Sequence, residues 1–143
     1  MFFDVLTVAG CHLATSPWPQ NLVLGFADGN RARRGFDGFA LVDLPWTDHR
    51  AEEKAFFLEL LALAADRYGW DRLTYDPPYA HHYVTRLRDM LTGFTPTPVA
   101  APAEDWRIPP APELLVRCPR HDLYTGYLGC RLCDTWIQGQ PQA

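Results

Sequence analysis

The spacing of apolar residues predicts one long helix in the middle of this 143-residue chain. Over residues 49–68, apolar side chains recur at three- and four-residue intervals, which places them on one face because each residue turns a helix by about 100°. Glu53 falls within that apolar face. A carboxylate there needs a polar partner or a metal ion, unless it bends out to water from the first helical turn. Glu53 is therefore the first candidate for a functional residue.

Shorter apolar runs, rich in β-branched and aromatic residues, predict strands around this helix. The expected strands are residues 2–9, 22–27, 36–44, 72–75 and 113–117, and a second helix is expected at residues 81–91. This order predicts an α/β fold with one mixed sheet. Three antiparallel strands come first, followed by a helix, a strand, another helix and a late fifth strand.

The chain divides into a core, a connector and a tail. Residues 1–94 hold the expected α/β core. Residues 95–112 contain six prolines in eighteen positions, so they predict an extended connector, packed on the core through Trp106. Residues 113–143 hold the fifth strand and a short tail that contains cysteines.

The tail contains two ligand pairs with equal spacing. Cys118 and His121 are separated by two residues, and Cys130 and Cys133 repeat that spacing after a short loop. Three cysteines and a histidine in this arrangement predict a structural zinc site, because all four positions of a tetrahedral ion would be filled by protein. The alternative interpretation is a loop and helix in which the cysteines are ordinary buried thiols.

Composition narrows the classes of function. The chain has 13 basic and 17 acidic residues, a net charge of −4, which argues against a protein that coats nucleic acid. One local basic cluster, Arg31, Arg33 and Arg34, remains a candidate contact with a phosphate or an acidic partner. Trp18, between two prolines, is the tryptophan most expected to be exposed for a partner.

The sequence shows neither an apolar stretch of membrane-spanning length nor a basic export leader. We therefore expect a cytoplasmic protein with no membrane partner, monomeric when free. In that reducing setting, four cysteines indicate a metal site or free thiols rather than disulfides.

Several short motifs occur together in the order seen in one family. They are Val8-Ala9-Gly10 after the first strand, Glu53 ahead of Leu60-Leu61-Ala62-Leu63-Ala64, Leu73-Thr74-Tyr75-Asp76 in the fourth strand, and Cys133-Asp134 near the end. With these motifs the chain resembles the ribonuclease H superfamily, type 1 ribonuclease H in particular. The resemblance implies that Glu53, Asp76 and Asp134 belong to a carboxylate cluster, which in that family holds two Mg²⁺ ions.

Ala9 stands where that family has the aspartate that bridges both ions. The resemblance therefore implies a degenerate scaffold in which the three carboxylates are remnants of a nuclease site. We expect a non-catalytic binding or regulatory protein that docks onto a protein or nucleoprotein machine, for example a phage-type transcription regulator that binds RNA polymerase. One alternative is a divergent Mg²⁺-dependent nuclease or resolvase. Another is a zinc-stabilised protein that binds nucleic acid through its arginines.

Overall fold

Helices take the place of the expected sheet in the part of the chain that the structure describes. The computed structural model describes residues 2–29, 40–73, 75–77, 79–100, 102 and 104–133. Strand pairing within these ranges is limited to one isolated antiparallel bridge between Arg117 and Tyr124. The predicted α/β sheet and the resemblance to ribonuclease H are therefore wrong. The α-helices in these ranges are α1 (Phe2–Leu13), α2 (Pro17–Ala27), α3 (Arg50–Ala65) and α4 (Ala80–Thr92).

Helix α1 occupies the expected first strand and is buried along most of its length. Residues 3–11 are all buried, including the polar residues Asp4 and Thr7 at 0% exposure. A continuous apolar run fits a buried strand or a buried helix, and spacing alone does not separate the two. Gly10 allows α1 to approach α2 closely, since a Cβ there would lie 2.5 Å from Cγ2 of Val23. Ala9 is a core residue of this helix, not the end of a catalytic strand.

Helix α2 begins at Pro17, ahead of the expected second strand. Ser16 precedes the helix with extended backbone, and Pro17 occupies its first turn. Proline is tolerated there because the first N–H groups of a helix have no partner within the helix, and its φ angle already suits helical geometry. The expected second strand, residues 22–27, is therefore the C-terminal half of α2.

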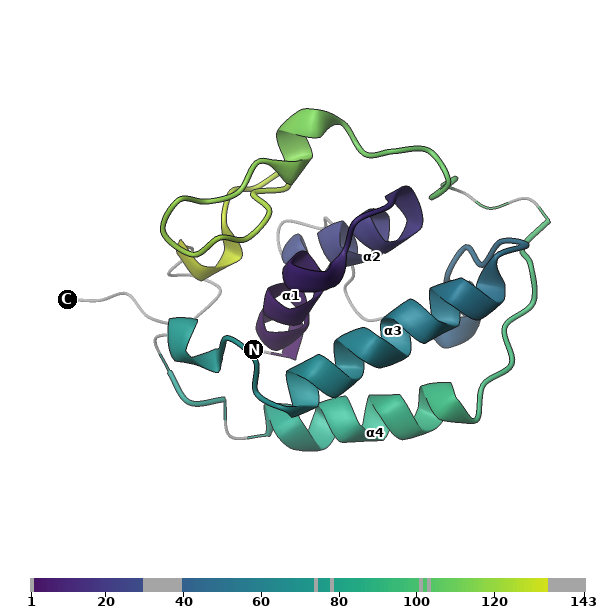
Figure 1. Ribbon diagram of the computed structural model, residues 1–143, viewed down its shortest axis with the longest axis horizontal. Coiled ribbons are helices and arrows are strands. Elements are labelled where there is room, and N and C mark those ends of the chain that lie inside the picture. Colours follow the sequence, from purple (N-terminus) through teal and green to yellow (C-terminus); the bar gives the residue numbers. More distant parts are fainter. Residues whose placement is uncertain are drawn as a thin grey trace.

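Helices α3 and α4 confirm the two helices predicted from the sequence, with different ends. The predicted apolar stripe of α3 is the buried one, and it contains Phe57, Leu60, Leu61 and Ala64. Gly69 lies in the turn after α3 with a φ angle of 71°, a left-handed conformation that glycine adopts without steric cost. The two helices run antiparallel and side by side (Figure 1).

The other expected strands are short 3₁₀ turns where the structure describes them. Residues 36–39 of the third strand lie outside the described residues, and its described end forms η1 (Leu41–Asp43). The expected fourth strand begins at the end of η2 (Trp70–Arg72) and continues as bends where it is described, and most of the fifth lies in η3 (Pro112–Leu115). A 3₁₀ turn of this length is a short connection between other elements, and it does not contribute a strand to a sheet.

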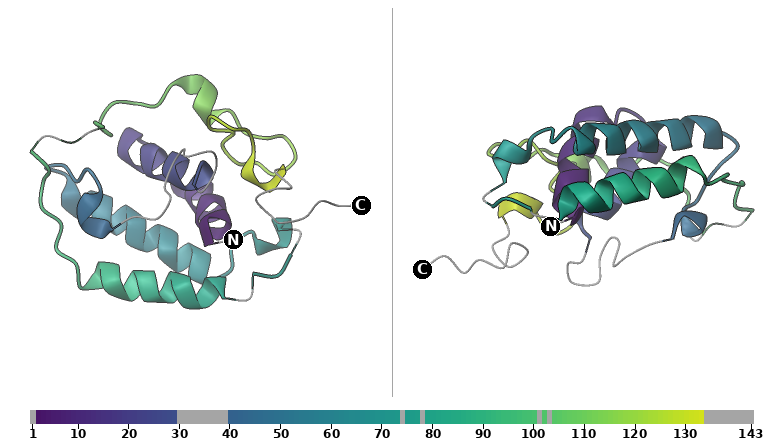
Figure 2. Two further views of the ribbon diagram at one scale, coloured as in Figure 1. Left: turned by 180° about the vertical axis from the view of Figure 1, so that it is seen from behind. Right: turned by 90° about the horizontal axis from the view of Figure 1, so that it is seen from below.

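Helix α1 packs against both α2 and α3, so it lies at the centre of the arrangement. The extended connector runs around the outside of the helices to the C-terminal segment, which lies beside α1 (Figures 1 and 2). Trp106 attaches the connector to the helices, because it is 6% exposed and its ring meets that of Trp18 at 5.3 Å.

Trp18 is buried, in contrast to the exposure expected from its position between two prolines. It is 4% exposed, its ring stacks on Trp46 at 5.2 Å, and its Nε1 donates a hydrogen bond to the carbonyl of Pro45 at 3.1 Å. The first turn of α2 directs this ring into the core, where it joins the connector to the helices.

Candidate metal centre

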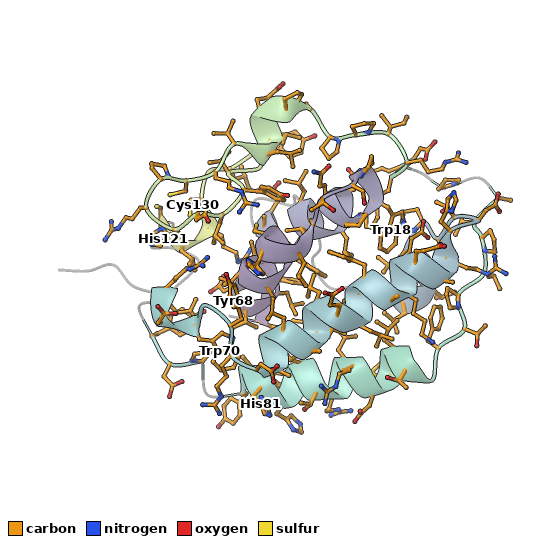
Figure 3. All side chains as sticks on the ribbon, viewed as in Figure 1. Trp18, Tyr68, Trp70, His81, His121 and Cys130 are labelled. Atoms are coloured by element: carbon orange, nitrogen blue, oxygen red, sulfur yellow. The ribbon has the colours of Figure 1, made fainter. Side chains whose placement is uncertain are left out.

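Residues 114–133, which we call the C-terminal module, form a short hairpin followed by η4 (Arg131–Cys133). Two backbone hydrogen bonds of 2.8 Å define the hairpin, from Thr125 to Val116 and from Cys118 to Leu123. Asp122 and Gly126 have φ angles of 57° and 58°, which reverse the chain tightly. The hairpin brings Cys118 and His121 towards the turn that carries Cys130 and Cys133. Figure 3 shows His121 and Cys130 together in this module.

The two predicted ligand pairs converge on one point. The donor atoms of Cys118, His121, Cys130 and Cys133 all lie within 4.8 Å of one another. Cys118 Sγ is 3.7 Å from Cys133 Sγ, and His121 Nδ1 is 3.3, 3.5 and 3.8 Å from the sulfurs of Cys133, Cys130 and Cys118. The cysteines are free thiols, so no disulfide holds this geometry. This group of four side chains can hold a metal ion.

Both ligand pairs present backbone N–H groups to their first sulfur. The sulfur of Cys118 accepts hydrogen bonds from the N–H groups of Arg120 and His121, and that of Cys130 accepts from Leu132 and Cys133. Such bonds stabilise a thiolate, which is the form of cysteine that binds metals. Burial opposes them at Cys118, yet the pKa of that thiol is lowered overall.

Without a bound cation, the other two sulfurs favour the neutral thiol. Burial raises the pKa of Cys130 to about 12, and burial together with a hydrogen bond to Cys118 raises that of Cys133. Burial lowers the pKa of His121, and the positive charges of Arg120 and Arg72 lower it further. The histidine is thus kept as neutral imidazole, the form that ligates metals. A bound divalent cation would supply the positive charge that is needed to stabilise these sulfurs as thiolates.

Arg131 lies between Cys130 and Cys133 in the sequence, and it connects the candidate metal centre to the helices. It is 1% exposed, and its Nε donates to the buried carboxylate of Asp4 on α1. Its Nη1 donates to the carbonyls of Phe26, Ala27 and Gly29, at distances of 2.6 to 3.3 Å, where α2 ends. These are carbonyls at a helix C-terminus, where a cation is favourable. The guanidinium therefore joins both N-terminal helices to the tight turn that carries Cys130 and Cys133.

Further contacts join the C-terminal module to α1. Leu123 and Tyr124 are buried at 0% and 3% exposure, and the N–H of Tyr124 donates to the sulfur of Cys11 at 3.4 Å. Arg117 donates to the carbonyl of Cys11 and lies over the ring of Tyr124 at 5.0 Å. The fourth cysteine thus belongs to the contact between module and helix, and it lies outside the group of metal ligands.

Glu53 has protein partners that account for its position on the apolar face. Its two carboxylate oxygens accept hydrogen bonds from the backbone N–H of Thr47, at 2.8 Å, and from the Thr47 hydroxyl. That hydroxyl also accepts from the N–H of His49. The arrangement ties the segment before α3 to the first turn of the helix, although the N-cap residue, His49, makes no side-chain cap hydrogen bond. The carboxylate is 5% exposed and needs no metal ion to be buried.

The other residues predicted from the ribonuclease H resemblance do not join Glu53 at a metal site. Asp76 is exposed, and neither it nor Glu53 belongs to the cluster of potential metal ligands found among the described residues. Asp134 lies outside the described residues, and so do Arg31, Arg33 and Arg34 of the predicted basic cluster. The sheet edge that was expected to gather the carboxylates is absent from the described part of the chain.

The chain matches no family model, and neither the curated proteins nor the solved structures contain a significant match to it. Within the described residues, no helix has both the length and the apolar character needed to cross a bilayer. The function is therefore inferred from the geometry of the C-terminal module and its surroundings.

Proposed function

We propose that this protein is a non-catalytic binding protein in which a structural zinc ion holds the C-terminal module in place. The observation that carries the proposal is the spacing of the four donor atoms. In a tetrahedral centre with Zn–S bonds of about 2.3 Å and a Zn–N bond of about 2.0 Å, neighbouring donors lie roughly 3.5–3.8 Å apart. Four of the six donor separations, 3.3 to 3.8 Å, lie close to these values, and all six are within 4.8 Å.

The donor set also favours a structural role over a catalytic one. Three sulfurs and one imidazole nitrogen fill all four positions, whereas catalytic zinc keeps one position for water or substrate. Soft thiolate ligands select zinc over magnesium or calcium, which prefer oxygen ligands. The contribution of the ion is then to folding, as for other small zinc modules.

Exposed apolar side chains on the module support binding to another protein. Val116, Tyr127 and Leu128 are 56%, 60% and 38% exposed, although all three belong to a segment of only twenty residues. Exposed apolar and aromatic groups on a rigid support are typical of contact sites between proteins. The described residues do not favour RNA polymerase over other proteins, so the partner is defined here only as a protein with an apolar contact site.

Metal analysis tests the zinc centre directly. We expect one zinc ion per purified chain, retained on dialysis, and a visible absorption typical of tetrahedral thiolate ligation when cobalt(II) replaces it. Cys130→Ser should weaken metal binding strongly, whereas Cys11→Ser, outside the centre, should leave the zinc content unchanged. A purified, folded chain that contains no zinc and takes up none would contradict the proposal.

A matched pair of surface variants tests the binding role. The double variant Tyr127→Ser/Leu128→Ser should lose captured partners from host lysate while keeping its zinc. The control is Tyr83→Ser/Met90→Ser on α4, where the two side chains are 50% and 60% exposed. If the control loses the same partners, or if the module variant keeps them, the module is not the contact site.

A further inference from the structure

A small polar cavity lies where the C-terminal module meets the ends of α1 and α3. Its volume is about 140 Å³, and it is lined by Cys11, His12, Tyr68, Arg72, Arg117 and Asp122. Figure 3 shows Tyr68 between α1 and the part of the module that carries His121. The cavity is separate from the four metal ligands, none of which lines it.

Arg72 lines this cavity with N–H donor groups whose hydrogen bonds to the rest of the protein are weak. Among the described residues, its Nη1 donates to the carbonyl of His121 and its Nη2 to the hydroxyl of Tyr68, both at 3.4 Å. These are long hydrogen bonds, and a guanidinium has five N–H donors. The Tyr68 ring lies 5.5 Å below the guanidinium carbon, which fixes its orientation.

Arg117 supplies a second guanidinium to the lining of the cavity. It is anchored by hydrogen bonds to the carbonyls of Cys11 and Asp122. Its ion pair with the Asp122 carboxylate is 3.6 Å long, and the Asp122 side chain is 70% exposed. Exposed pairs of this kind contribute little to stability, so this carboxylate neutralises only part of the positive charge.

The remaining lining groups add no negative charge at neutral pH. Burial raises the pKa of the Cys11 thiol to about 12, so this side chain stays neutral. His12 and Tyr68 are joined by a hydrogen bond of 3.0 Å between Nδ1 and the hydroxyl. The two positive charges of Arg72 and Arg117 exceed the one negative charge of Asp122. The cavity therefore carries an excess of one positive charge even with neutral His12.

We propose that this cavity binds a single tetrahedral oxyanion, a phosphate group, between Arg72 and Arg117. Two planar guanidinium groups in one lining suit the oxygens of a phosphate, which they can contact through charge-assisted hydrogen bonds. The volume holds a group of this size together with a few waters, since one water takes about 30 Å³ of liquid. The phosphate is either a free ion or the end of a small phosphorylated molecule whose remainder stays outside.

Titration of the zinc-loaded full chain with inorganic phosphate, followed by ¹H–¹⁵N NMR at constant ionic strength, tests the proposal. We expect saturable shifts at the amides of residues that line the cavity. Arg72→Gln should weaken binding by about tenfold or more, because a hydrogen bond to a charged group is typically worth at least that factor. Tyr68→Phe, which keeps the ring, should weaken it less.

The matched control is Arg50→Gln, which removes one exposed arginine at the start of α3 and should leave phosphate affinity unchanged. Titration with O-phosphoserine separates the two sources of the group. Equal or tighter binding indicates a phosphorylated molecule, and binding of inorganic phosphate alone indicates the free ion. Shifts that do not saturate, or equal affinities in wild type and Arg72→Gln with the fold intact, would refute the site.

Discussion

The side chain of Arg131 connects the C-terminal module to helices α1 and α2. It lies between two candidate metal ligands in the sequence, yet its hydrogen bonds go to Asp4 of α1 and to carbonyls at and just after the end of α2. Tyr75 adds a hydrogen bond to the same Asp4 carboxylate, and the pKa of the tyrosine is raised by its burial and by this bond. Removing one partner of a buried ion pair is costly, because the other charge stays buried without compensation.

Replacing Arg131 with leucine should destabilise the protein by about 3–5 kcal/mol, because the Asp4 carboxylate stays buried without its guanidinium partner. Urea unfolding followed by circular dichroism measures the change. The control is Arg120→Leu, an exposed arginine inside the other ligand pair, which should change stability by no more than about 0.5 kcal/mol. The double variant Asp4→Leu/Arg131→Leu should recover part of the loss. Equal effects of the two single variants would contradict this account.

Glu53 leads to a smaller expected effect. Glu53→Ala removes both acceptors of the Thr47 hydrogen bonds and should cost about 1–3 kcal/mol, the range for a buried polar group left without its partner. Glu52→Ala is the matched control, since its side chain is 77% exposed and lies 3.8 Å from His49 in an exposed pair. Thermal unfolding of both variants distinguishes a buried, hydrogen-bonded carboxylate from an ordinary surface one. If Glu52→Ala proves as costly as Glu53→Ala, the bonds to Thr47 are not what holds the start of α3.

At the scale of elements, the sequence predicted the helices that carry one polar face and failed on those that do not. Helix α3 has a solvent-facing side, so its three- and four-residue spacing is visible. Helix α1 is buried along nearly all its length, so its apolar residues cover every side of the helix and show no clear period. The β-branched residues of that segment favoured a strand, but tertiary packing overrides so weak a preference.

The metal ligands were predictable because each pair lies within four residues and its spacing is set by a tight turn. The attachment of the module was not predictable. Asp4 and Arg131 are 127 positions apart, and nothing local marks either residue as a partner of the other. The phosphate cavity has the same difficulty, because its lining comes from four separate segments.

Removal of the metal should loosen the C-terminal module before it affects the helices. Buried sulfur and imidazole groups that lose their common ion no longer hold the hairpin to η4, while contacts among α1, α2 and α3 remain. Hydrogen exchange after treatment with a chelator should therefore show lost protection at residues 116–130 and retained protection in α3. Simultaneous loss at both sites would mean that the module and the helices unfold as one unit.

At the scale of the whole molecule, the four cysteines should fall into two classes of reactivity. With zinc bound, we expect no thiol to react at pH 8. A chelator should release the three ligands first, and Cys11, which is 1% exposed beneath Tyr124 of the module, should react only later, once the loosened module or a denaturant uncovers it. With a pKa of about 12, its thiolate fraction at pH 8 is roughly one in ten thousand. Alkylation followed by peptide mass spectrometry counts each class, and early labelling of Cys11 would contradict the structure.

The pairing of Asp4 with Arg131 also has a consequence for the time course of synthesis. The ribosome adds about 5–20 residues per second, so Asp4 exists for on the order of ten seconds before the 127th residue after it is made. During that interval α1 has its carboxylate but not the guanidinium that neutralises it. The last described turn of the chain therefore completes the burial of the first helix, and a nascent chain stalled before that turn should expose α1 to chaperones and proteases.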